Sequence, residues 1–240
     1  MLIGNVFANA ILNNQTNFMK RYIVNLLLLL SLFLFTGCFE IIEEISLNDN
    51  GSGNISMTAN LSRSKTKISS IMLMDSINGY KVPKKETVQK HINKIVSELK
   101  QIKGVSNVKY NTDFNDYIFN ISCDFTNVEV LNKVILHFTT KNKANTVTKA
   151  KQFSYNKKTK TFVRTYKYNI ANEMKKINEK DKDVLQNASV TTIYRFQSPI
   201  ISASNKKAHR SKNQKAIMLK VTVQDIINHQ SDIKNTIKLK

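Results

Sequence analysis

Residues 39–61 read FEIIEEISLNDNGSGNISMTANL, and this stretch decides the class of fold. Its two ends, residues 39–47 and 54–61, have the pattern of β-strands. Between them lies Asn48-Asp-Asn-Gly-Ser-Gly53, whose Asn, Asp and Gly residues supply the positive φ angles that a tight turn needs. Two strands joined this closely pair in the antiparallel sense, so the domain begins with a hairpin.

The same turn offers several oxygen ligands and could be interpreted as part of a calcium site. It lacks the regular spacing of acidic residues and the closing bidentate Glu of a calcium-binding loop. We therefore predict a turn and no metal ligands.

The clearest helix spans residues 86–103. Its apolar residues recur at intervals of three and four, which is the pattern of a helix with one buried face. They are Val88, Ile92, Ile95, Val96, Leu99 and Ile102. Gly104 follows where a glycine commonly ends a helix. Residues 105–110 and 116–125 are predicted to form the next two strands.

A second helix is predicted to begin at Thr126 or Asn127 and a third after Asn169, each with one apolar face. The second places Val128, Leu131, Val134, Ile135 and Phe138 on that face. The remaining predicted strands are residues 152–155, 161–168, 190–197, 216–223 and 236–239, the last closing the sheet. Thr222 and Asp225 have the spacing of a capping box, which predicts a short helix.

Strands outnumber helices, and neighbouring strands are joined by short turns. The predicted fold class is therefore α+β, with a largely antiparallel sheet packed against two or three amphipathic helices. Residues 62–85 are harder to assign, because Ile68, Ile71, Met72 and Met74 suit either a short helix or a mobile apolar flap.

Residues 19–38, MKRYIVNLLLLLSLFLFTGC, resemble a bacterial lipoprotein signal peptide. Lys20 and Arg21 form a positive start, and the apolar stretch that follows is shorter than the roughly 20 residues of a membrane-spanning helix. Thr36-Gly37-Cys38 supplies small residues and then a thiol for lipidation. One departure is Phe35, where Leu is commonest. An ordinary secretory signal or an uncleaved anchor is the alternative.

This interpretation divides the chain into three parts. Residues 1–18 are a start assigned too early or a long n-region, residues 19–37 are the signal peptide, and residues 38–240 form a single exported α+β domain. Such a protein is expected in the bacterial cell envelope, lipid-anchored to a membrane, which is the outer membrane in a Gram-negative cell.

The exported part is strongly basic. Only Lys20 and Arg21 of the chain's 37 lysines and arginines precede Cys38, and all 17 acidic residues follow it. This charge favours an anionic partner such as anionic lipid or lipopolysaccharide. Export and the excess of Lys over Arg argue against nucleic acid. A generally solvated basic surface explains the same composition.

The second cysteine, Cys123, has no partner in its own chain if Cys38 is acylated, so no intramolecular disulfide is expected. Cys123 shares one face of a strand with Phe119, Ile121 and Phe125. We predict a buried core residue rather than a reactive thiol.

No catalytic or cofactor-binding motif is found. The four histidines (His91, His137, His209 and His229) have no partner at metal-ligand spacing, and the nucleophile-elbow, Walker and Rossmann patterns are missing from the sequence. Glu43 and Glu44 are adjacent on a strand and point to opposite faces, so they form no acid/base dyad. The sequence predicts a protein that is not an enzyme and has no cofactor or metal.

Two features favour binding instead. The predicted basic hairpin interleaves its lysines with Phe153, Tyr155, Phe162, Tyr166 and Tyr168, which suits a lipid interface. Strand alternation with these aromatics in the core explains the same pattern. An antiparallel sheet under amphipathic helices can also enclose an apolar cavity, with residues 62–80 as its lid.

The layout resembles a broad group of bacterial envelope lipoproteins, loosely the LppM-like ones, on two sets of residues. Residues 38–53 give a lipidated cysteine followed closely by a strand and an Asn/Asp-Gly-Ser-Gly turn, and residues 200–223 give a strand, a polar loop and another strand leading to a short helix. The resemblance implies an α/β domain that in some members binds lipid, and it identifies no site residue beyond Cys38.

The sequence thus predicts a membrane-anchored lipoprotein with a non-enzymatic binding domain for lipid or another anionic envelope component. The alternative is a structural or assembly lipoprotein that acts through a protein partner.

Overall fold

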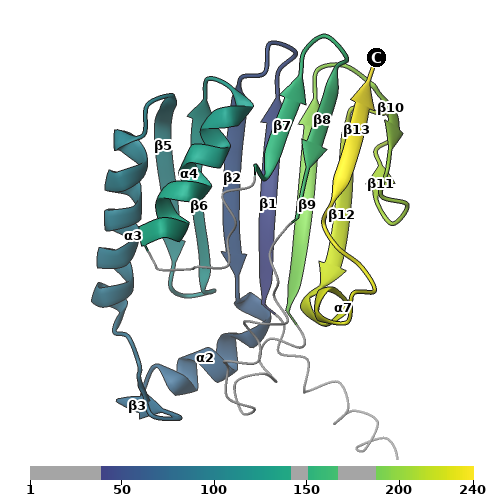
Figure 1. Cartoon of the computed structure of the whole chain (residues 1–240). Helices are drawn as coiled ribbons and strands as arrows, with labels where there is room; N and C mark the ends of the chain where they lie inside the picture. The colour runs from purple at the N-terminus through teal and green to yellow at the C-terminus, as the bar shows by residue number, and fades with distance from the viewer. Residues whose placement is uncertain (1–38, 142–150, 167–187) are drawn as a thin grey trace, which may run out of the picture. The chain divides into compact units, whose positions relative to one another are not determined.

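The structure is a computed structural model that describes residues 39–141, 151–166 and 188–240. It has the predicted α+β class, with sheets that are mainly antiparallel (Figure 1). The predicted signal peptide, Cys38 and the helix predicted after Asn169 lie outside the described residues.

The large sheet has seven strands in the order β11-β12-β9-β1-β2-β6-β5. They are β1 Glu40–Leu47, β2 Gly53–Asn60, β5 Val105–Asp113, β6 Ile118–Phe125, β9 Ser189–Phe196, β11 His209–Arg210 and β12 Ala216–Thr222. β1 and β9 are parallel, and every other pair in this sheet is antiparallel. The predicted hairpin is confirmed, with Gly51 at a φ of 85° in the turn between β1 and β2.

A small sheet of four strands packs over one half of the large sheet. Its order is β10 Ile200–Ala203, β13 Asn235–Leu239, β8 Thr161–Arg164 and β7 Phe153–Asn156. The ring of Phe162 in β8 lies 5.1 Å from that of Tyr194 and 5.7 Å from that of Phe196, both in β9. Because β13 belongs to this small sheet, the sequence prediction that residues 236–239 close the same sheet as the other strands is wrong. Alternation of apolar and polar residues indicates a half-buried strand, but it does not determine which strand pairs with it.

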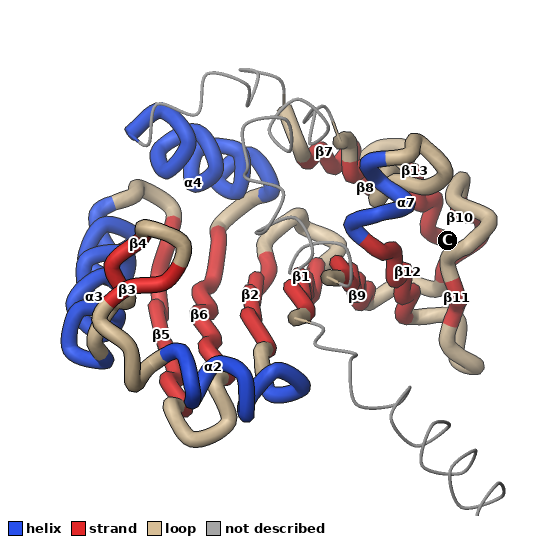
Figure 2. Tube along the Cα trace, turned by 90° about the horizontal axis from the view of Figure 1, so that it is seen from below, coloured by secondary structure: helices blue, strands red, loops and turns tan. Residues whose placement is uncertain are grey.

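Helices cover the other half. α3 Lys85–Gln101 packs against β5 with Ile92, Val96 and Leu99 buried. α4 Val128–Lys141 begins after Asn127, whose side chain accepts a hydrogen bond from the Glu129 amide at 3.1 Å. α4 and the small sheet lie on the same side of the large sheet (Figure 2). Both predicted helices are confirmed.

Gly104 joins α3 to β5, and its φ of 95° favours glycine. A Cβ atom there would also lie 2.7 Å from the Val130 side chain in α4. The prediction that this glycine ends the helix is confirmed. The lack of a side chain at Gly104 also lets α4 pack close to this part of the backbone.

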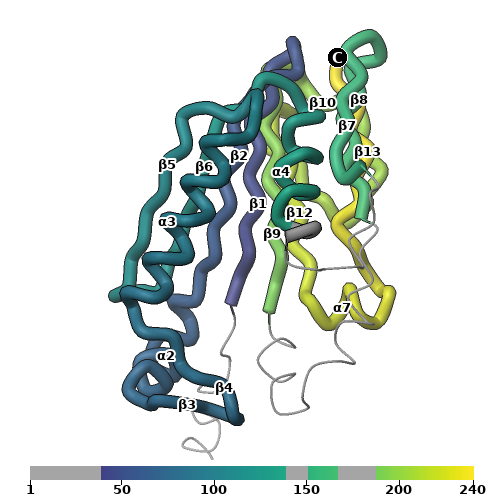
Figure 3. The backbone as a smooth tube through the Cα atoms, turned by 60° about the vertical axis from the view of Figure 1, so that its left-hand side comes forward, coloured from purple at the N-terminus to yellow at the C-terminus, as the bar shows by residue number. Residues whose placement is uncertain are grey.

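The remaining elements are short. α7 Val223–Ile227 starts with the predicted cap, in which the Asp225 amide donates to the Thr222 hydroxyl at 3.0 Å. Residues 62–84, which we call the flap, contain a 3-10 turn at Ser62–Ser64, α2 Lys65–Ile71, β3 Ser76–Ile77 and β4 Tyr80–Lys81. The short predicted helix is thus present, followed by a small hairpin. The flap lies at the end of the large sheet where β1 begins (Figure 3).

The two faces of the large sheet differ in chemistry. The inner face, toward the small sheet, α3 and α4, carries most of the apolar core. The outer face carries polar pairs across the strands. On that face the Asn120 amide donates at 2.7 Å to both the Ser56 and the Thr58 hydroxyls, and the Arg195 guanidinium pairs with Glu44 at 2.9 Å.

Candidate functional site

A charged cluster is buried between the two sheets. Glu43 lies on the inner face of β1, flanked there by apolar residues, and only 7 % of its surface is exposed. Arg164 of β8 reaches it from the small sheet with two nearly parallel hydrogen bonds, Nε to Oε1 at 3.1 Å and Nη2 to Oε2 at 2.9 Å. The Tyr194 hydroxyl of β9 donates to the same carboxylate at 2.6 Å. Three strands from two sheets therefore meet at one carboxylate.

The rest of the Arg164 side chain is also held. Its Nη1 donates to the Gln152 side chain at 3.2 Å and to the Thr165 carbonyl at 2.7 Å. Its guanidinium carbon lies 4.4 Å from the centre of the Phe153 ring, which is cation–π distance. Among the described residues, no buried side-chain nitrogen or oxygen lacks a hydrogen-bond partner.

Burial and charge shift the pKa values of this cluster. Burial raises the pKa of Tyr194 well above its usual value, and the Glu43 charge beside it adds to the rise. For Arg164, burial alone would lower the pKa, but the charge and hydrogen bonds of Glu43 outweigh it and the pKa is raised. Arg164 therefore stays protonated and Tyr194 stays neutral at ordinary pH.

A cavity of about 330 Å³ lies beside this cluster. It is bounded by β1 and β2 of the large sheet, by α4, and by the segment around β7 and β8. Most of its lining is apolar, and its polar side chains are Glu43, Arg164 and Gln152 of the charged cluster, with Tyr166 beside them. The described lining residues are Glu43, Ile55, Met57, Leu131, Val134, Ile135, Gln152, Phe153, Arg164 and Tyr166.

The cavity has an apolar body with one polar end, which is the usual plan of a small-molecule site. Its volume is at the lower end of the range for such sites, roughly 300–1,000 Å³. Contacts with described residues use four of the five N–H groups of Arg164, and the fifth is on Nη2. One donor thus remains beside the cavity for an acceptor oxygen.

A second hollow lies on the exposed side of α3, between Lys85, Gln89 and Phe114. It is an open surface depression of about 440 Å³ with mostly polar side chains around it. The Lys85 ammonium lies 5.9 Å from the Phe114 ring centre. Because water reaches this hollow freely, it is a weaker candidate than the cavity between α4 and the small sheet.

The sequence predicted some of these placements and missed the main one. Glu43 and Glu44 do point to opposite faces, as expected. The pairing of Glu43 with Arg164 was not predicted, although a signal exists. Glu43 follows Ile41 and precedes Ile45 at alternate positions, and Arg164 follows Phe162 in the same way, so both charges occupy core-facing positions.

The other singled-out residues lie apart from the cavity. Cys123 is 3 % exposed, and burial raises its thiol pKa to about 11, which confirms the predicted core residue. His91, His209 and His229 are exposed, whereas His137 pairs with Glu98 at 3.1 Å. Across residues 39–141, 151–166 and 188–240, no three His, Cys, Asp or Glu side chains are grouped to hold a metal ion.

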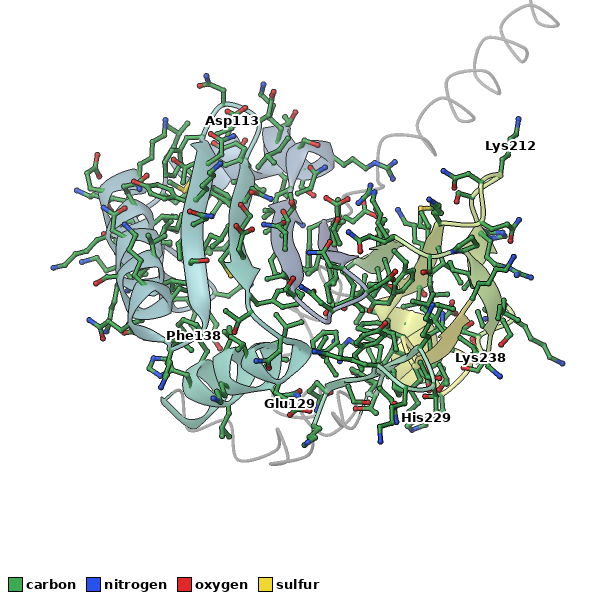
Figure 4. The ribbon with its side chains drawn as sticks, turned by 90° about the horizontal axis from the view of Figure 1, so that it is seen from above. Asp113, Glu129, Phe138, Lys212, His229 and Lys238 are labelled. Atoms are coloured by element: carbon green, nitrogen blue, oxygen red, sulfur yellow. The ribbon has the colours of Figure 1, made fainter. Side chains whose placement is uncertain are left out.

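The aromatic residues of the basic hairpin mostly face inward. Phe153 is 1 % and Phe162 0 % exposed, while Tyr155 and Tyr166 are half-buried and Tyr168 lies outside the described residues. The core explanation of this pattern is therefore correct for the two phenylalanines. Lysines such as Lys212 and Lys238 are exposed and point away from the sheets (Figure 4).

The lid prediction is not supported, because no described lining residue of the cavity comes from residues 62–80. In the part of the chain that the structure describes, no helix is both long and apolar enough to cross a bilayer.

Comparisons with known proteins give a loose structural likeness. No protein-family model and no curated protein matches this sequence. Among solved structures, the folded domain of LppM from Mycobacterium tuberculosis, determined by NMR, is similar with a TM-score of 0.41 and 9% sequence identity. The match covers 84% of this chain and 89% of that chain.

Proposed function

We propose that this protein is an envelope lipoprotein, anchored through Cys38, whose α+β domain binds an acyl chain in the cavity beside Glu43 and Arg164. The observation that carries this proposal is an apolar cavity with a single polar end. Ile55, Leu131 and Val134 offer contacts for a hydrocarbon chain, and the Arg164 Nη2 group offers a hydrogen bond to an ester or carboxyl oxygen.

The size of the cavity limits the ligand. About 330 Å³ accommodates part of one acyl chain, so the rest of a diacyl lipid would have to extend outside. The charge at the polar end is also limited, because Glu43 already neutralises Arg164. A neutral ester or amide oxygen fits this end better than a fully charged phosphate.

Binding rather than catalysis fits the state of the polar groups. Glu43 accepts three hydrogen bonds, two from Arg164 and one from Tyr194. The oxygens of this carboxylate are thus occupied by donors of the protein and are not left to contact a ligand. The cluster therefore positions a ligand and joins the sheets.

Native mass spectrometry with lipid extraction tests the proposal on the full chain purified from bacterial membranes. A stoichiometric bound lipid is expected in the natural protein. Met57→Trp should displace it by filling the cavity, because Met57 lines the cavity. Met218→Trp is the matched control, since Met218 is similarly exposed (43 % against 39 %) but lies on the outer face in β12.

Two other results are informative. A lipid retained equally by both variants would place it outside the cavity. A bare protein mass from the natural chain, together with a copurifying protein, would favour the alternative role as an assembly lipoprotein.

A further inference from the structure

The flap, residues 62–84, exposes large apolar side chains at its tip. Leu73 is 90 % exposed, Tyr80 60 %, Met74 50 % and Ile77 36 %. These four residues come from a stretch of eight, whereas the other large exposed apolar side chains of the described residues are scattered over β2, β5, α4, β10 and β12. Burying such a tip against an apolar phase would be favourable.

The base of the flap is fastened to the domain. The Ser69 and Tyr117 hydroxyls lie 3.2 Å apart, and the Lys65 ammonium contacts Asp116 at 2.7 Å. Val82 is buried, and its amide donates to the Asp75 carbonyl at 3.0 Å across the foot of the hairpin. The tip is thus a projecting, supported structure.

The charges around this tip are mostly positive. Residues 62–85 contain six cations, of which Lys65 is paired with Asp116, and a single carboxylate, Asp75. An apolar tip on a segment rich in cations matches the interface of an anionic bilayer, where acyl chains lie beneath phosphates.

The register of the first two strands fixes where the flap lies. Glu40 at the start of β1 pairs with Asn60 at the end of β2, so the flap begins two residues beyond the partner of Glu40. Only Phe39 separates Glu40 from Cys38. Two residues of extended chain span at most about 7 Å.

We propose that the flap is a second membrane contact, in which Leu73, Met74, Ile77 and Tyr80 insert into the interface of the anionic bilayer that holds the lipid anchor. This inference rests on the lipidation of Cys38 in the proposed function. An acylated Cys38 leaves no linker, so the end of the sheet that bears the flap is pressed against the head groups. The flap then fixes the orientation of the domain on the membrane.

The chain contains no tryptophan, so Leu73→Trp introduces a single fluorescent reporter at the tip. The acylated full chain is placed in phosphatidylcholine vesicles with phosphatidylglycerol, with and without brominated lipid. We expect a blue-shifted emission that brominated lipid quenches. Ile201→Trp is the control, because Ile201 is 53 % exposed in β10. β10 pairs with β13 and lies far from the flap (Figure 1).

The charge contribution is tested in the Leu73→Trp background. Lys81→Ala should weaken insertion by about fivefold on phosphatidylglycerol vesicles, the effect of one lysine near an anionic surface. Lys238→Ala removes an exposed lysine from β13 and should leave quenching unchanged.

The outcomes separate this inference from the proposed function. Quenching of Leu73→Trp but not of Ile201→Trp supports the flap contact. Unquenched emission from a chain whose mass confirms acylation overturns it, as does a blue shift that depends on protein concentration but not on brominated lipid. If the mass shows an unmodified Cys38, the proposed lipid anchor is wrong. The unmodified chain is then mixed with the same vesicles, and quenching of the Leu73→Trp emission by brominated lipid still tests whether the flap contacts the membrane.

Discussion

The two halves of the inner face of the large sheet are covered in different ways. Over β1, β9 and β12 the small sheet lies flat against the large one, and Phe162, Tyr194 and Ile237 are at most 1 % exposed. Over β2, β5 and β6 the cover is α3 and α4, and there Met57 is 39 % and Tyr110 46 % exposed. The sheet-covered half is therefore the more closely packed of the two, and the cavity lies at the border between them, lined by residues from both.

The largest expected effect comes from truncating one phenylalanine in each half of the inner face. Phe162→Ala should lower the free energy of unfolding by the upper part of about 3–5 kcal/mol, because Phe162 is fully buried among aromatic rings. Phe119→Ala should cost clearly less, since Phe119 is only half-buried. Urea denaturation followed by circular dichroism measures both. Equal losses would show that the two halves are packed alike.

The ion pair at the border between the halves gives the next largest effect. Arg164→Met should lower the free energy of unfolding by about 3 kcal/mol or more, because it leaves the Glu43 carboxylate buried without its cation. The double variant with Glu43→Met should recover much of the loss. A double variant as unstable as the sum of the two single variants would mean that the residues do not act as a pair.

The raised pKa of Tyr194 predicts how the free energy of unfolding changes at alkaline pH. Its pKa is raised in the folded state by burial and by the Glu43 charge, so its proton is held more tightly than in the unfolded chain. The resulting stability is fully present below the unfolded tyrosine pKa of about 10 and is lost as pH rises further. Tyr194→Phe should cost about 1–3 kcal/mol at neutral pH and should show a shallower alkaline loss. Parallel pH profiles would contradict this assignment.

Cys123 reports on the helix-covered half. Its pKa of about 11 and its burial predict that a thiol reagent at pH 8 reacts only on unfolding. In denaturant, a chain acylated at Cys38 should show one reactive thiol, and an unmodified chain two. Rapid labelling of the native protein would show that this half opens well below the global unfolding energy.

Substitution of Asp124, on the outer face, should have the smallest effect on the free energy of unfolding. Its pKa is lowered by hydrogen bonds from Asn107 and Asn54, so its contribution is present above the unfolded pKa of about 3.9 and is lost as pH falls below it. Because the group is largely exposed, Asp124→Asn should cost under about 1 kcal/mol at pH 7. Acid titration of both proteins should converge at low pH, and a gap that persists there would exclude the charge as the cause.

The sequence predicted local structure better than partners. The turn at 48–53, the stripe of α3 and the Thr222 cap follow from contacts within a few residues, and each is confirmed. The parallel pairing of β1 with β9 and the place of β13 in a second sheet depend on residues far apart in the chain. Alternation cannot supply this information, because it fixes which side chains share a face but not which strand lies alongside.

The candidate site was missed for the same reason. Glu43 and Arg164 are 121 residues apart, and each looks like an ordinary surface charge until the strands are placed. The hairpin in the flap was not predicted either, although Asn78-Gly79 forms its turn with φ angles of 51° and 83°. Asn-Gly between two short apolar segments is a known hairpin signal.

The pairing of β1 with β9 also determines when the domain can fold. β1 is the first strand of the domain, yet its parallel neighbour starts only at Ser189, and Tyr194 of that strand is 151 residues from Glu43. During synthesis, one edge of β1 therefore stays unpaired until most of the chain has been made. Such long-range pairing places folding in the slow range, about milliseconds to seconds. β1 is thus among the first strands to be synthesised and among the last to gain all of its partners.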